Sequence, residues 1–238
     1  MATTLLERKA ILDDSTRLAI NEVVHVWDVA QGLPSAEFRS VMINSIQPIA
    51  DPYAAGASNL GAAWYDESAP ELPFRATPSQ LPPAERLYRS SEWAMASSGA
   101  DALALLAEVV QGFIWDSNRQ TIKDNAAAET GGRWVRTATA KACRFCQMLV
   151  TRSQEVYASE LAATRVGHAK SGRVRGNQAV GDKYHDNCKC QAMEVRPGKT
   201  HTPASYTENW LEDYNAAREL AGSGDLTAIM AAYRQMDK

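Results

Sequence analysis

The chain has 238 residues, of which 45% are hydrophobic, and a formal net charge of −3. This length allows one large domain or two small ones, and the apolar content is sufficient for a core. No apolar run approaches the roughly 18 residues that a membrane span requires, so we expect no membrane-spanning helix. The first residues lack the apolar stretch of a signal peptide, which predicts a reducing compartment.

Apolar residues recur at helical spacing at the start of the chain. They predict a helix over residues 3–31, which Gly32 and Pro34 end. Residues 13–16 are Asp, Asp, Ser and Thr, whose side chains compete for backbone groups, so we expect them to divide this helix.

A second predicted helix begins at Ser35. Pro48 and Pro52 lie within its apolar pattern, and we expect them to kink or break it, because proline lacks the N–H that the helix needs. Residues 54–63 are mostly small, which would let two helices approach closely.

A proline-rich segment then separates further helices. Residues 67–83 contain five prolines and no apolar period, so an extended linker is expected, and helices are predicted over 84–96 and from 98 or 99 to about 128. The predicted organisation is an N-terminal helical region (1–66), the linker (67–83), a helical region (84–130), a Cys/His-rich module (131–199) and C-terminal helices (200–238).

The Cys/His-rich module differs in charge from the rest of the chain. Residues 133–199 carry a net charge of +8 and the remaining residues −11. Such asymmetry can mark a face for nucleic acid or for an acidic partner.

Within the module, residues 134–139 and 191–195 predict two short strands that pair. Residues 157–164 predict a helical turn, and residues 167–182 a glycine-rich basic loop. Two amphipathic helices, residues 206–220 and 225–236, are expected to follow. The predicted fold class is therefore mainly α, with a helical N-terminal two-thirds, a small α+β module resembling a zinc knuckle, and C-terminal helices.

All four cysteines lie in 48 residues of this module. The C-x-x-C of Cys143 and Cys146 places two sulfurs near one bend, and His185 and Cys188 form a second closely spaced pair, with Cys190 as a further thiol. Thiolate and imidazole ligands at this spacing suit zinc better than magnesium or calcium. We therefore predict a structural zinc site with Cys143, Cys146, His185, Cys188 and Cys190 as candidate ligands.

Other uses of these cysteines remain open. Two disulfides could form in three pairings, although a reducing compartment disfavours them. A redox C-x-x-C would require a thioredoxin-like βαβ context, which the sequence around Cys143 does not show. The thiols could also pack without metal.

The module resembles a known viral signature. The segment from Trp134 through the C-x-x-C to Ser153, with Tyr157 and the later Tyr184-His-Asp-Asn-Cys-Lys-Cys190, is similar to MuF-like phage minor head proteins of the head morphogenesis family. The match is closest to the branch from phages of actinobacteria, often described as capsid maturation proteases. Asp186 stands where the wider family usually has proline.

The resemblance implies a minor capsid protein that binds the portal protein, the major capsid protein or both during head assembly. It implies assembly in the host cytoplasm and a place inside the phage head near the portal. The enzymatic alternative is a maturation protease that cleaves scaffold or capsid protein, with His168 or His185 as its base.

No catalytic motif in the sequence supports the protease alternative. The chain contains no H-E-x-x-H, G-x-S-x-G or Walker A motif, and no G-x-G-x-x-G after a strand. We therefore expect a binding role without catalytic residues. A third hypothesis is an internal head protein that binds packaged DNA through a basic set of residues, in a salt-sensitive and sequence-independent way. That set is Arg133, Arg136, Lys170, Arg173 and Arg175.

Overall fold

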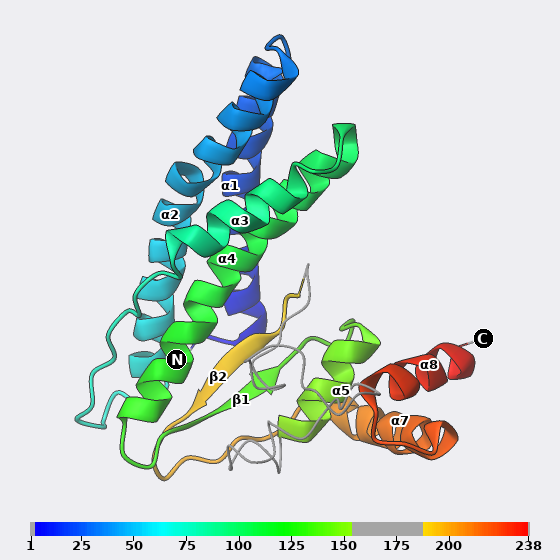
Figure 1. Cartoon of the computed structure of the whole chain (residues 1–238). Coiled ribbons are helices and arrows are strands. Elements are labelled where there is room, and N and C mark those ends of the chain that lie inside the picture. Colours follow the sequence, from blue (N-terminus) through cyan, green and yellow to red (C-terminus); the bar gives the residue numbers. More distant parts are fainter. Residues whose placement is uncertain (1–2, 154–187, 238) are drawn as a thin grey trace. The chain divides into compact units, whose positions relative to one another are not determined.

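A computed structural model describes residues 3–153 and 188–237, and the chain divides into two compact units, residues 1–132 and 133–238. The first unit contains α1 (Leu5–Ala30), α2 (Ser35–Glu67), α3 (Ala84–Ala94) and α4 (Gly99–Ala128). The second contains β1 (Arg133–Thr137), α5 (Arg144–Ser153), β2 (Gln191–Val195), α7 (Tyr206–Ala221) and α8 (Leu226–Met236) (Figure 1). This architecture confirms the predicted fold class. No helix of the described residues is long and apolar enough to cross a membrane.

Helix α1 is continuous, so the predicted division at residues 13–16 is wrong. The helix starts with a capping box, in which the Glu7 N–H donates to Thr4 Oγ1 at 3.3 Å and the Thr4 N–H donates to the Glu7 carboxylate at 2.8 Å. Thr16 is buried, and its hydroxyl accepts a hydrogen bond from the Trp115 indole N–H at 3.2 Å. Its side chain therefore has a partner on α4, which offsets its tendency to compete for the backbone of α1.

Helix α2 is also continuous, so it does not break at Pro48 or Pro52, where we predicted a kink or a break. Both prolines lie on its exposed side, four residues apart. Water can therefore hydrate the carbonyl groups that lose an N–H donor. The opposite face of α2 is fixed by burial of Ile46, Ile49 and Ala50.

The core of the first unit lies between α1, α2 and α4. Leu12, Val23 and Ile46 are fully buried, as are Leu106 and Ile114 of α4. Burial of each such side chain stabilises the fold by about 1.5–3 kcal/mol relative to exposure. The periodic apolar residues of the three helices thus meet in one cluster.

The small residues of α2 allow a close approach to α4, as predicted. A Cβ atom added at Gly61 would lie 3.1 Å from both the Asn118 carbonyl oxygen and the Thr121 Cβ. The Asn118 amide also donates to the Ala57 carbonyl at 2.9 Å. Glycine at this position lets the two helix backbones come together.

The proline-rich segment has no helix or strand, and it is hydrogen-bonded to α2 and α4. The Asn125 side chain accepts from the Thr77 N–H at 2.9 Å and donates to the Thr77 carbonyl at 2.8 Å. Two residues further on, the Ser79 N–H donates to Thr121 Oγ1 at 3.1 Å, and the Ser58 hydroxyl donates to the Ser79 carbonyl at 3.0 Å. These bonds satisfy backbone groups that have no secondary-structure partner.

In the second unit, β1 and β2 pair as predicted. The pairing is antiparallel and runs from Arg133 opposite Val195 to Thr137 opposite Gln191. Met148 of α5 and Ile229 of α8 are fully buried in a separate cluster with Ala217 of α7.

Helix α5 was not predicted, because a C-x-x-C is typical of a tight turn. Its ten residues are too few to be stable from helix propensity alone, so tertiary contacts must hold it. Arg144 supplies some of them, since its guanidinium forms ion pairs with Asp213 of α7 and with Asp237 just after α8, the latter at 2.5 Å. The predicted helical turn at 157–164 and the basic loop at 167–182 lie outside the described residues.

Two glycines of α2 should respond oppositely to substitution. Gly56→Ala should raise the free energy of unfolding by about 0.5–1 kcal/mol, because the site is open and alanine is the better helix former. Gly61→Val should lower it by about 1–3 kcal/mol through overpacking against α4. Urea unfolding monitored by circular dichroism measures both values, and equal tolerance at the two positions would contradict the close approach of α2 to α4.

Candidate metal centre

Three cysteines from two separate segments meet in the second unit. Cys146 lies in the first turn of α5, and Cys188 and Cys190 lie on the segment that leads into β2. The pairing of β1 with β2 brings these segments together. Thr137 and Gln191 form the last pair at one end of the ladder. From this end, the segment after β1 continues toward α5, and the segment before β2 contains Cys190.

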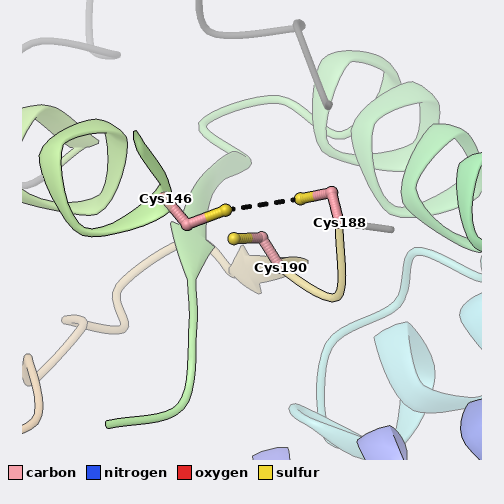
Figure 2. A group of neighbouring side chains, drawn as sticks. All are labelled: Cys146, Cys188 and Cys190. Atoms are coloured by element: carbon pink, nitrogen blue, oxygen red, sulfur yellow. Dashed lines mark hydrogen bonds between the residues drawn. The ribbon is translucent and has the colours of Figure 1, made fainter. Parts of the chain in front are cut away.

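Figure 2 shows the three sulfurs converging. The Sγ atoms of Cys146 and Cys188 are 3.5 Å apart, and all three Sγ atoms lie within 4.8 Å of one another. Each side chain is less than 5% exposed. Thiolates at this spacing form a donor set for a soft ion such as zinc. Three buried cysteines are therefore placed where they could hold a metal ion.

The two remaining predicted ligands, Cys143 and His185, are not part of this cluster of three buried cysteines as the structure describes it. Cys143 is exposed, but its thiol hydrogen-bonds with that of Cys146. It immediately precedes α5, and its carbonyl accepts from the Gln147 N–H at 2.9 Å. His185 and the alternative base His168 lie outside the described residues. Cys190, which the sequence analysis treated as an additional thiol, belongs to the buried cluster.

Apolar and aromatic side chains enclose the cluster. Val150 of α5, Ala138 after β1 and Trp210 of α7 pack around the sulfurs. Tyr206 lies against Trp210 with a ring separation of 4.9 Å, and its hydroxyl donates to the Ala138 carbonyl at 2.8 Å. Sequence reasoning did not assign Trp210 or Tyr206 to the site, because their only signal was the amphipathic pattern of α7.

In the absence of metal, the environment raises the pKa of the Cys146 and Cys190 thiols and so favours their protonated forms. Hydrogen bonding with Cys143 has the largest effect on the Cys146 thiol and raises its pKa, and contacts with Cys188 and Cys190 and burial raise it further. For Cys190 the hydrogen bond with Cys146 lowers the pKa, but Cys188 and burial outweigh it and the pKa rises to about 12. A bound cation would reverse this balance and release protons.

The basic residues proposed for DNA contact are not equivalent. Arg133 is exposed, whereas Arg136 is fully buried and is not available to surface phosphates. Lys170, Arg173 and Arg175 lie outside the described residues. The positive charge of Arg136 acts on Cys190, whose pKa it lowers.

In the metal-free, reduced protein, stability should fall as the pH rises above about 8.5, the ordinary pKa of a thiol. The folded thiols keep protons that the unfolded chain releases, so their contribution is complete below that pH. For Cys190 it is lost as the pH rises toward about 12. The slope should be about 1.4 kcal/mol per pH unit for each such thiol.

Urea unfolding at a series of pH values, with a chelator and a reductant present, measures this slope. Cys190→Ala should reduce it, because one raised pKa is removed. A variant slope equal to that of the wild type would contradict the assignment.

Comparison with known proteins gives one family. The family model described as VG15 protein matches residues 2–217, which is most of the chain and includes all four cysteines. No curated protein and no solved structure matches the chain. VG15 is a viral protein family that includes phage proteins, in agreement with the viral origin that the cysteine motif implies. The chain belongs to the VG15 protein family.

Proposed function

We propose that this VG15-family chain is a minor head protein of a phage, which acts by binding other head components rather than by catalysis. Family membership supports the viral setting. The resemblance of the segment from Trp134 to Cys190 to MuF-like head morphogenesis proteins supports the more specific role.

The observation that carries the proposal is the buried convergence of Cys146, Cys188 and Cys190. These residues belong to the motif shared with MuF-like proteins, and they lie under α7 side chains rather than in an open cleft. A nucleophilic cysteine needs access and a lowered pKa, whereas Cys146 and Cys190 have raised values. The motif therefore fits a structural role better than a catalytic one.

We assign zinc to this cluster. Zinc is the ion that buried protein thiolates most commonly bind in structural sites, and a filled tetrahedral site leaves no position for substrate. The second unit has a sheet of two five-residue strands, and such a sheet has little stability alone. Zinc binding would add folding free energy to it directly.

The expected partners are the portal protein, the major capsid protein or both. The helical unit of residues 1–132 contains 9 Lys or Arg and 17 Asp or Glu, so it presents an acidic surface to a partner. Acidic surfaces steer association with basic protein surfaces and oppose DNA contact. Docking of this unit onto another head protein fits its charge better than contact with packaged DNA.

Removal of the metal should destabilise the second unit. Purified, reduced wild-type protein should contain about one zinc per chain, and Cys188→Ser should lose both the zinc and several degrees of melting temperature. Elemental mass spectrometry and calorimetry measure the two quantities. Ile229→Val is the matched control, because it should destabilise the same unit by about 0.5–1.5 kcal/mol and keep its zinc. Wild-type protein without metal, with stability equal to that of Cys188→Ser, would exclude the zinc assignment.

The head-protein role predicts where the chain is found. Quantitative mass spectrometry of purified heads from the encoding phage should detect it in lower copy than the major capsid protein. Heads from a phage that carries Cys188→Ser should contain less of it, while scaffold and capsid processing continue. Absence of the wild-type chain from both procapsids and finished heads would refute the role. Loss of capsid or scaffold cleavage in the variant would favour the protease alternative.

A further inference from the structure

The arrangement of the thiols defines the metal centre more closely than the sequence motif does. In a tetrahedral zinc site with Zn–S bonds of about 2.3 Å, the sulfurs are about 3.8 Å apart. The Cys146 and Cys188 sulfurs are separated by 3.5 Å, and that of Cys190 is within 4.8 Å of both. These separations are compatible with three corners of one tetrahedron around a zinc ion.

Cys143 has the properties required of the fourth ligand. Its thiol hydrogen-bonds with that of Cys146, one of the three clustered cysteines, although Cys143 itself is not among the three sulfurs that lie within 4.8 Å of one another. It also stands at the N-terminus of α5, where unpaired backbone N–H groups and the helix dipole stabilise a thiolate. Its exposure is compatible with this role, because one ligand of a surface-proximal site can face solvent.

The strand register supplies a second, independent observation. Arg136 pairs with Ala192 in the ladder, and Cys190 immediately precedes the first residue of β2. The positive charge of Arg136 also lowers the pKa of Cys190, so the two groups are within electrostatic range. Arg136 is 0% exposed and Cys190 is 2% exposed. A guanidinium remains charged at every accessible pH, and its burial is costly unless negative charge lies nearby.

The ligand type decides how much negative charge the site carries. Zinc with two thiolates and two imidazoles is neutral, zinc with three thiolates and one imidazole carries −1, and zinc with four thiolates carries −2. Because a zinc site with more thiolate ligands is more negative, a buried cation beside the sulfurs stabilises most the ligand sets with the most thiolates.

We propose that Cys143, Cys146, Cys188 and Cys190 form a four-thiolate zinc centre and that Arg136 is its buried counter-cation. This inference rests on the zinc assignment made above, but not on the head-protein role. The proposed ligand set does not include His185, a ligand candidate from the sequence motif.

Zinc X-ray absorption spectroscopy of the full, reduced chain tests the ligand set. The wild type should fit four sulfur neighbours at about 2.3 Å, without a nitrogen shell at about 2.0–2.1 Å. Cys143→Ser should replace one sulfur by a lighter atom and weaken zinc binding, whereas His185→Ala should leave both the spectrum and the affinity unchanged. Three sulfurs and one nitrogen in the wild type, with the nitrogen lost in His185→Ala, would overturn the proposal.

Chelator competition tests the role of Arg136. Arg136→Met, which removes the charge and keeps much of the volume, should lower zinc affinity by about 10- to 100-fold, as is typical when an outer-shell partner is removed. Arg136→Lys should recover a large part of that loss, because it restores the charge. Both variants should keep four sulfur neighbours.

Equal zinc affinity in the wild type and Arg136→Met would contradict the assignment of Arg136 as the counter-cation. Equal loss in Arg136→Met and Arg136→Lys would assign Arg136 to packing instead. Neither measurement uses phage heads, so a chain that binds zinc through four thiolates but is absent from heads would refute the head-protein role alone.

Discussion

The second unit depends on the pairing of β1 with β2. The ladder joins residues that are more than 50 positions apart and places the start of β2 beside the end of β1. Without this pairing, Cys188 and Cys190 would have no fixed relation to Cys146 on α5. Two strands of five residues bury little area, so the ladder needs support from the sulfur cluster and from α7. The sheet positions the thiols, and metal bound to the thiols would in turn fix the sheet.

The first unit is held together differently, because apolar packing between long helices dominates it. Several of its buried polar side chains have a specific hydrogen-bond partner. The Thr16 hydroxyl accepts a hydrogen bond from the Trp115 indole N–H, and the Asn125 side chain hydrogen-bonds with both the N–H and the carbonyl of Thr77. A buried polar group without a partner would cost about 1–3 kcal/mol, so these contacts restrict which segments can lie against α4. The extended segment around Thr77 is therefore an ordered part of the helical unit.

Periodicity predicted most of the fold because helices α1, α2, α4, α7 and α8 have one apolar face each, and the two strands were located from their short alternating pattern. The errors share a physical origin. The division expected at residues 13–16 and a break at the two prolines of α2 follow from local preference, which tertiary contacts and exposure to water override. Helix α5 was missed because its stability comes from Arg144 and from packing with α7 and α8, neither of which has a local signature.

For the candidate site too, the sequence predicted local features such as residue spacing, but not the burial and packing that depend on the fold. The motif identified the cysteines, since C-x-x-C spacing is a local property, but it could not rank Cys190 against His185 or show that Cys143 is exposed. Charge counting had a related weakness, because it treated Arg133 and Arg136 as members of one basic surface. The pleat of β1 sends alternate side chains to opposite faces, so Arg133 and Arg136 lie on different faces, and Arg136 shares its face with its partner Ala192. Arg136 is fully buried, so part of the positive charge of this module lies in its interior and not on a surface that DNA could contact.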